Sequence, residues 1–149
     1  MKHVLFIDTR NATRSQMAEA WFNHLANGYA EARSCGTMPA DRIGGRAVQV
    51  MKEVGTDIRF KRPRAVTQQL MNWADIVVLI GTGIFPQAFT PTYIWKLEDP
   101  SGKAIDQVRI LHDEIRRMVE NLIAEIESQE IDTAIDQVFV PALQQMIIS

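Results

Sequence analysis

The chain has 149 residues, of which 46% are hydrophobic and 23% are charged, and its formal net charge is -2. This length and composition are typical of one globular domain with a single core, and the nearly neutral charge argues against a nucleic-acid-binding protein. No apolar stretch is long enough to span a membrane and the start of the chain lacks the apolar region of a signal peptide, so we expect a cytoplasmic protein with no membrane or nucleic-acid partner.

Apolar strands alternate with amphipathic helices along the chain. The apolar run Val4–Ile7 predicts a first strand, and apolar residues three and four apart between Ser15 and Ala26 predict a helix. The elements that follow are a strand over 29–34, a helix from Gly44-Gly45 to Gly55, a short helix from a Thr67 cap to Trp73, a strand over 76–80, a strand over 93–97 and a long helix containing Val108 to Ile126.

This order predicts a small flavodoxin-like, doubly wound α/β fold, in which a four-stranded parallel sheet has helices on both faces. We expect one domain over residues 1–129, followed by a C-terminal helical extension over residues 130–149. Ligands of such sheets bind beyond the carboxyl ends of the strands. The segment after Val4–Ile7 is therefore the first candidate for a site.

The extension has an apolar stripe. Its members follow the spacing of one helix face and are Ile131, Ala134, Ile135, Val138, Phe139, Ala142, Leu143, Met146 and Ile147. We expect Pro141 to kink this helix or to divide it. Two interpretations remain open: the stripe packs on the chain's own core, or it forms a homodimer contact through residues 131–147.

The segment from Asp8 to Ser15 predicts an anion-binding loop. A strand that turns into a helix through small and polar residues directs several backbone N–H groups at one point, and the helix N-terminus adds a partial positive charge. Arg14 adds a planar set of donors. Phosphate, sulfate or arsenate would suit this loop, and its predicted anion-binding residues are Thr9, Arg10, Asn11, Ala12, Thr13, Arg14 and Ser15.

These residues resemble the low-molecular-weight protein tyrosine phosphatase superfamily, in its arsenate reductase branch. The family's loop is Cys-x5-Arg-Ser, and counting back from Arg14 places its nucleophilic cysteine at Asp8. Further matches follow in the family's order. They are Ser34-Cys35-Gly36-Thr37 with Pro39-Ala40, Ala74-Asp75-Ile76-Val77-Val78 with Gly81, and Trp95 to Lys103, so the resemblance runs from about Lys2 to about Ile126.

The resemblance assigns roles to the matching residues. Asp8 takes the nucleophile's position, Arg14 is the clamp for the oxyanion, and Asp99 of the Asp-Pro pair is the general acid. Ser15 would hydrogen-bond the nucleophile, and Asn11 would brace the loop. Taken alone, Ser15 could be only a helix cap and Asp99 only the start of a turn.

Asp8 has three interpretations. It is a working nucleophile that forms an acyl phosphate, kept ionised by Arg14 and the loop N–H groups. Alternatively its carboxylate fills the loop itself, so that an oxyanion binds weakly because two negative groups repel each other. In the third interpretation Asp8 turns aside and the loop binds an anion without turnover.

Arsenate reduction by the family's thiol route has the least support. That route needs the loop cysteine, and many members use further cysteines as a relay. Here Gly81-Thr82-Gly83 stands where a relay cysteine is typical, and Cys35 is the only cysteine. We interpret Cys35 as a small buried hydrophobic residue that follows the second strand, and we expect no metal and no cofactor.

Two function hypotheses follow. The first is a catalytically degenerate family member, an oxyanion-binding pseudoenzyme. The alternative is an active phosphatase with Asp8 as nucleophile and Asp99 as general acid, either metal-independent or assisted by Mg²⁺. The basic run Lys61-Arg62-Pro63-Arg64 is interpreted as a solvated loop, or as a patch that steers an acidic ligand toward the site.

Overall fold

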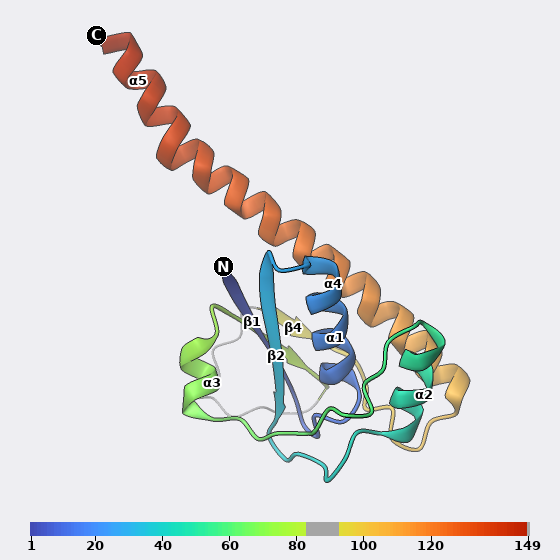
Figure 1. Ribbon diagram of the computed structural model, residues 1–149. Helices are drawn as coiled ribbons and strands as arrows, with labels where there is room; N and C mark the ends of the chain where they lie inside the picture. Colours follow the sequence, from blue (N-terminus) through green and yellow to red (C-terminus); the bar gives the residue numbers. More distant parts are fainter. Residues whose placement is uncertain (83–92, 149) are drawn as a thin grey trace.

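The chain forms the predicted α/β domain with a long helix that projects from it (Figure 1). The computed structural model describes residues 1–82 and 93–148. The elements in chain order are β1 (Lys2–Asp8), α1 (Arg14–Ala26), β2 (Ala30–Gly36), α2 (Gly45–Glu53), α3 (Gln68–Trp73), β3 (Ile76–Ile80), β4 (Tyr93–Trp95), α4 (Ile105–Ala134), a π-helical turn (Ile135–Phe139) and α5 (Val140–Ile148).

The sheet has four parallel strands in the order β2-β1-β3-β4. The chain leaves β1 toward β2 on one side and returns to β3 on the other, so the order reverses beside the carboxyl end of β1. This is the topological switch point of a doubly wound sheet, where ligands bind. The predicted fold class is confirmed, and Asp8 is the last residue of the strand at that point.

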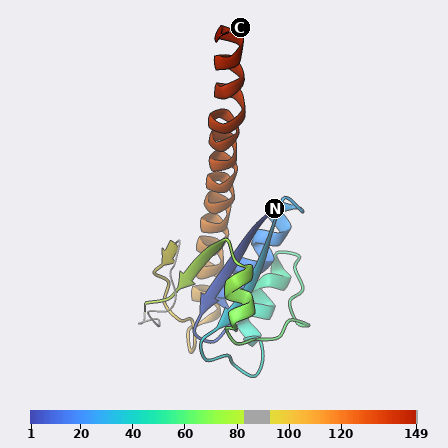
Figure 2. The same ribbon diagram turned by 90° about the vertical axis from the view of Figure 1, so that its left-hand side faces the viewer.

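Side chains of β1 alternate between two apolar clusters, one on each face of the sheet. Val4 and Phe6 pack with α1, α2 and α4 in the larger cluster. Leu5 and Ile7 pack with Leu70 of α3 in the smaller one. Figure 2 shows α3 in front of the strands and α4 behind them. Because successive strand residues point to opposite faces, one strand binds both helix layers and fixes the position of its own carboxyl end.

Several element boundaries differ from those predicted. β2 extends to Gly36, so Cys35 lies inside the strand rather than after it. β4 ends at Trp95, two residues earlier than expected. The Thr67 cap is confirmed, since its hydroxyl accepts a hydrogen bond from the Leu70 N–H at 3.1 Å. In the predicted Gly81-Thr82-Gly83 segment, Gly83 lies outside the described residues.

The C-terminal stripe does not pack on the domain, so that interpretation is wrong. From Ile131 to Ile148 every side chain is exposed except the half-buried Ala134. The 30-residue α4 is about 45 Å long, whereas the seven-residue β1 spans about 23 Å, so the helix outruns the sheet that it covers. The end of the chain consequently projects into solvent (Figure 1).

Pro141 does not divide the helix. A π-helical turn over Ile135–Phe139 precedes it, and α5 continues directly from Val140. A π turn shifts the hydrogen-bond pattern by one residue, which accommodates the N–H that proline lacks. Among the described residues, no helix is both long and apolar enough to cross a membrane.

Gly36 is in close contact with the loop that follows β1. A Cβ atom at this position would lie 2.7 Å from the Thr9 carbonyl oxygen and 2.9 Å from the Asn11 backbone nitrogen. The residues after Gly36 follow the loop closely, because Thr37, Met38 and Ala40 donate backbone hydrogen bonds to the carbonyls of residues 8, 9 and 10 at 2.7–3.0 Å. The end of β2 therefore determines the shape of the loop.

We predict that Gly36→Ala lowers the free energy of unfolding by about 1–3 kcal/mol, because the added methyl group meets backbone atoms that cannot move independently. Urea denaturation measures this. Gly45→Ala is the matched control, since a Cβ there meets no atom within 4 Å and alanine is the better helix former by up to about 1 kcal/mol. A Gly36→Ala protein as stable as the parent would contradict the close contact.

Candidate functional site

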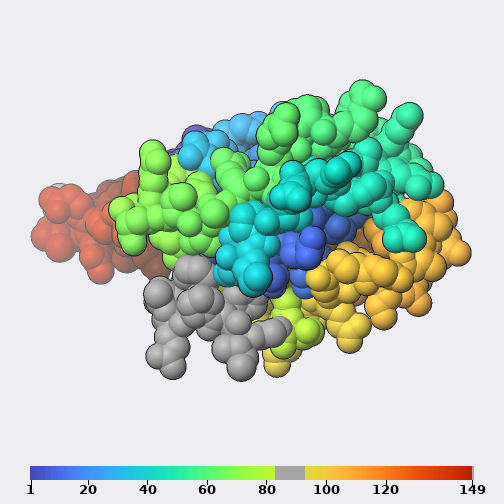
Figure 3. All heavy atoms as spheres, turned by 90° about the horizontal axis from the view of Figure 1, so that it is seen from below, coloured from blue at the N-terminus to red at the C-terminus, as the bar shows by residue number. Residues whose placement is uncertain are grey.

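The candidate site is the loop between β1 and α1. Asp8 ends the strand and Arg14 begins the helix, so residues 9–13 form the turn between them. Figure 3 shows the face onto which the loop opens, with the blue N-terminal atoms lying between the cyan to teal segment that leads into α2 and the yellow segment around residue 100. The switch point of the sheet and the predicted anion loop therefore coincide.

The Asp8 carboxylate lies inside the loop and is 1% exposed. One oxygen accepts the Asn11 N–H at 2.7 Å, and the other accepts the Ser15 N–H at 3.0 Å. The Nε atom of Arg14 lies 4.0 Å from the second oxygen. The carboxylate thus uses N–H groups of the loop itself, and the interpretation in which Asp8 turns aside does not match this geometry.

Burial raises the pKa of Asp8 above its ordinary value of 3.8, although several contacts oppose the change. The Ser15 N–H, the Arg14 charge, the Asn11 N–H and the Ser15 hydroxyl all favour the ionised form. Removing the carboxylate from water therefore outweighs the contacts that favour its ionised form.

Asn11 braces the loop through both ends of its amide. Its Nδ2 donates to the hydroxyls of Ser15 and Ser34 at 2.8 and 2.9 Å. Its Oδ1 accepts from Gln16 Nε2 and from the Arg64 backbone N–H, both at 3.0 Å. The backbone of Asn11 has a φ of 51°, a left-handed conformation that asparagine tolerates better than most residues. The Asn11 side chain therefore connects the loop to side chains of α1 and β2 and to the backbone at Arg64.

Arg14 is 4% exposed and contacts the segment that follows β4. Its Nη1 donates to the Leu97 carbonyl at 2.8 Å. This bond brings together the predicted clamp and the segment that contains Asp99, which are 85 residues apart in the sequence. A guanidinium fixed by a backbone carbonyl has fewer rotamers to lose when it binds an anion.

Asp99 is exposed, and its Oδ1 accepts the Ser101 N–H at 2.9 Å. Burial acts to raise its pKa, but the Ser101 N–H and hydroxyl and the charges of Arg14 and Arg10 together lower the pKa below its ordinary value. Asp99 is thus within electrostatic range of Arg14 and Arg10. A lowered pKa keeps Asp99 ionised at neutral pH in the ligand-free protein, as an ordinary aspartate is.

The other predicted anion-binding residues contribute backbone donors. Among the described residues, the N–H groups of Arg10, Ala12 and Thr13 have no hydrogen-bond acceptor. The carbonyls of Arg10 and Ala12 accept from Ala40 and Gly44 at 2.9 and 3.0 Å, so the peptide planes are fixed. Asp8 occupies part of the loop, and donors remain for a ligand.

Sequence reasoning missed a second group of residues that supports the loop. Glu19 is 3% exposed and pairs with Lys61 at 3.5 Å and with Arg64 at 3.3 Å. Arg64 Nε also donates to the Ser34 carbonyl at 3.0 Å. The basic run is therefore partly structural rather than a solvated loop. The sequence gives no signal for this ion-pair group, because the burial of Glu19, which makes such partners necessary, follows only from the fold.

Cys35 is fully buried, as interpreted from the sequence, and burial raises the pKa of its thiol to about 12. A thiol in that state is a poor nucleophile and a poor metal ligand at neutral pH. Within residues 1–82 and 93–148, no group of three or more His, Cys, Asp or Glu side chains is arranged to hold a metal ion.

Known proteins resemble this chain over most of its length. Residues 3–132 match the family described as low molecular weight phosphotyrosine protein phosphatase. A glutaredoxin arsenate reductase of Synechocystis sp. is 35% identical over 131 residues, which are 85% of this chain and 99% of that protein. Arsenate reductase 2 of Staphylococcus epidermidis is 30% identical over 126 residues, covering 80% and 95% of the two chains.

The fold comparison agrees with the sequence comparison. A solved structure of an arsenate reductase in the phosphate-binding state superposes with a TM-score of 0.77 at 34% identity, covering 85% of this chain and 99% of that one. The matched region includes the loop, the brace and the segment of Asp99, and it ends near the start of the exposed tail. The chain therefore belongs to the low molecular weight phosphotyrosine protein phosphatase family, in its arsenate reductase branch.

Proposed function

We propose that this protein is an oxyanion-binding member of its family in which Asp8 replaces the nucleophilic thiol and restricts access to the loop. One observation carries the proposal: the Asp8 carboxylate lies inside the loop and accepts the Asn11 and Ser15 N–H groups. These two N–H groups are therefore already hydrogen-bonded when a phosphate or arsenate ion approaches the loop. The proposed protein binds such anions weakly at neutral pH and does not turn them over.

Repulsion between the Asp8 carboxylate and a bound anion determines how much the affinity of the loop for that anion is lowered. Two unit charges about 4 Å apart interact by on the order of 4 kcal/mol at an effective dielectric constant of about 20. Protonation of Asp8 removes this repulsion, and the raised pKa of Asp8 makes protonation easier than for an exposed aspartate. Anion binding in this proposal is therefore coupled to proton uptake.

The loop keeps the means to hold an anion. The N–H groups of Arg10, Ala12 and Thr13 have no acceptor among the described residues, and Arg14 is held beside them by the Leu97 carbonyl. These features support binding rather than loss of all function. Phosphate, sulfate and arsenate share the tetrahedral shape and the negative charge that such donors recognise.

The alternative is an aspartyl-phosphate phosphatase. A carboxylate oxygen of Asp8 would attack phosphorus, the alkoxide would leave with a proton, and water would then hydrolyse the acyl phosphate. The departing alkoxide needs a proton donor, and Asp99 is a carboxyl group within electrostatic range of the loop. The Asp8 carboxylate carries a charge of the same sign as phosphate, which opposes its attack on phosphorus. Reduction of arsenate by the thiol route has no sulfur at position 8, and the thiol of Cys35 is buried in β2.

We predict that Asp8→Ser increases the affinity for inorganic phosphate at neutral pH at least tenfold, or by about 1.4 kcal/mol, because the variant has no negative charge in the loop. Isothermal titration calorimetry measures this. Adding Arg14→Ala to the same variant should abolish the gain. A parent protein that binds phosphate as tightly as Asp8→Ser would contradict the proposal.

We predict that the parent protein shows no turnover of a generic phosphomonoester, with or without Mg²⁺, and that Asp8→Cys introduces phosphatase activity. The thiolate would then face intact N–H donors and Arg14. Release of the alcohol is followed spectroscopically, with Asp8→Asn as the control. Turnover by the parent that disappears in Asp8→Asn would establish the aspartyl-phosphate alternative.

Asp8 should also give stability a defined pH dependence. Its folded-state pKa is raised above 3.8, so the folded protein binds a proton that the unfolded chain releases. The stabilisation is present below about pH 4 and is lost as the pH rises through the raised pKa, by at most about 1.4 kcal/mol per pH unit. We predict that the stability of the parent relative to Asp8→Ala is highest near pH 4 and falls as the pH rises from there toward neutrality. Urea denaturation at about pH 4 and about pH 7 tests this, and a constant stability difference between the two proteins would contradict it.

We further propose that the projecting tail binds a second copy of this chain. The core-facing row of α4 includes Val119, Leu122 and Ile126, and its continuation at steps of three and four falls on polar residues, Glu130, Thr133 and Gln137. The apolar residues of the tail therefore form a separate row, directed away from the domain's own core.

The charge pattern of the tail favours an identical partner. Residues 137–148 contain no Asp, Glu, Lys or Arg, whereas residues 125–136 contain five acidic residues and no basic ones. An antiparallel pair related by a two-fold axis places the uncharged end of each copy along the acidic part of the other. This arrangement separates the like charges and covers exposed side chains such as Val138 and Phe139, which are 61% and 60% exposed.

We predict that the parent sediments as a dimer and that Val138→Glu combined with Phe139→Glu sediments as a monomer, because the added charges would be buried at the contact. Gln137→Glu, which adds charge outside the apolar row, should remain dimeric. Sedimentation velocity distinguishes the two states. A monomeric parent would contradict the pairing.

A further inference from the structure

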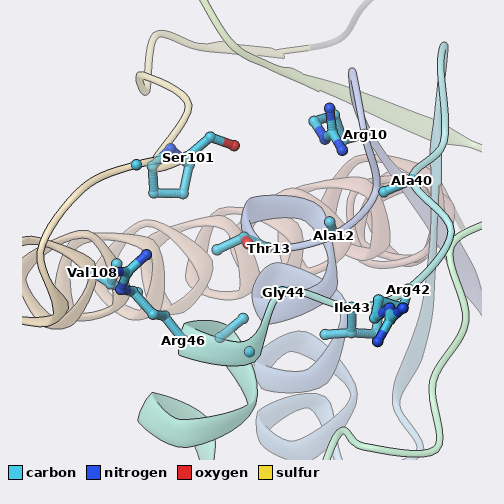
Figure 4. Close-up of a pocket in the computed structure, with 14 residues that line it drawn as sticks. Arg10, Ala12, Thr13, Ala40, Arg42, Ile43, Gly44, Arg46, Ser101 and Val108 are labelled. Carbon is cyan, nitrogen blue, oxygen red and sulfur yellow. The ribbon is translucent and has the colours of Figure 1, made fainter.

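A hollow of about 250 Å³ lies directly beside the anion loop. Arg10 to Thr13 of the loop form one side, the segment from Ala40 to Ala47 forms the second, and Pro100 to Gly102 form the third. Figure 4 shows Arg10, Arg42, Arg46 and Ser101 placed around this space. The hollow and the loop share residues, so one ligand can contact both.

The side chains around the hollow are strongly basic. Arg10 follows β1, Arg42 precedes α2 and Arg46 lies in the first turn of α2. Among the described residues, none of these three arginines forms an ion pair, and no Asp or Glu lines the hollow. Arg10 also interacts electrostatically with the nearby Asp99 carboxylate, whose pKa it helps to lower. Three guanidinium groups without an ion pair around one space attract an anion, since each retains several donors in a planar arrangement.

The walls also indicate what kind of molecule fits. The apolar lining is aliphatic, with Ile43 and Val108, and none of the described residues that line the hollow is aromatic. Apart from the guanidinium groups, an aromatic ring would find no stacking partner in this lining. The volume corresponds to roughly eight water molecules, which is more space than one phosphate group fills. Ser101 and Thr13 add hydroxyl groups to the lining.

We propose that this hollow binds the second anionic group of a small aliphatic polyanion, while a phosphate-type group of the same molecule occupies the loop. The recognising chemistry is the set of Arg10, Arg42 and Arg46, whose positive charges accommodate a second phosphate or carboxylate that the loop cannot reach. The inference rests on the proposed function, because the loop supplies the other half of the site.

Contacts made in the hollow can offset the repulsion between a ligand and the Asp8 carboxylate. Arg42 and Arg46 belong to the segment after β2, whereas Asp8 is enclosed by the loop. A ligand with two anionic groups gains contacts at the arginines that offset part of its repulsion by Asp8. Such a ligand therefore binds the parent protein at neutral pH, where a simple phosphate binds poorly.

The test compares inorganic phosphate, phenyl phosphate and 2,3-bisphosphoglycerate by isothermal titration calorimetry on the full chain. We expect the bisphosphate to bind at least tenfold more tightly than the other two. Arg42→Ala and Arg46→Ala should each weaken bisphosphate binding by about tenfold, which is the usual size of one charge-assisted contact. Phosphate binding by the Asp8→Ser protein should not change when either arginine is replaced.

Arg62→Ala is the matched control. Arg62 is exposed, forms no ion pair with a described residue and does not line the hollow, so its removal changes the net charge equally without removing a contact. If Arg62→Ala and Arg42→Ala lowered the affinity for the bisphosphate equally, general electrostatic steering would explain the loss. That result would overturn the inference. Equal affinities for the three ligands would also overturn it.

The two proposals fail in different ways. If Asp8→Ser gains no phosphate affinity but the bisphosphate still depends on Arg42 and Arg46, the account of Asp8 is wrong and the arginine site stands. If Asp8→Ser gains phosphate affinity and the arginine variants bind the bisphosphate normally, the account of Asp8 stands and the arginine site is wrong.

Discussion

The burial of the Asp8 carboxylate is the constraint on which the rest of the site depends. The loop supplies hydrogen bonds to both oxygens, from the N–H groups of Asn11 and Ser15. These bonds do not fully replace water, because the pKa of Asp8 is still raised. A single side chain thus brings a negative charge into a loop that is otherwise shaped to receive one. Access of an anion to the loop and the protonation of Asp8 are consequently linked.

The rest of the domain holds this loop in a fixed shape. β1 is anchored by apolar contacts on both faces, and the segment after β2 follows the loop with four backbone hydrogen bonds. Asn11 and the Glu19 ion pairs connect the loop to α1 and to the segment around Arg64. Because of these contacts, we expect the loop to keep its conformation when a single residue is substituted. The nucleophile's position can therefore be altered while the anion donors remain in place.

Much of this architecture could be predicted from the sequence, because it depends on local patterns. Continuous apolar runs identified β1 and β3, and the eight-residue segment from Asp8 to Ser15 identified the loop. The protonation of Asp8 could not be predicted, since it reflects the balance between burial and four opposing contacts. The role of Arg64 was also missed, because its partner Glu19 lies 45 residues away and only the fold brings them together. The hollow beside the loop likewise depends on three segments that meet in space.

The projecting helix has a separate consequence for how the sequence can vary. Its first half covers the sheet, and substitutions there change the packing of the core, as at Val119 or Leu122. Its second half contributes nothing to that core, so selection can alter it without a cost in folding. The domain and the tail can accordingly evolve at different rates, and related chains can gain, exchange or lose the tail while they retain the same anion loop.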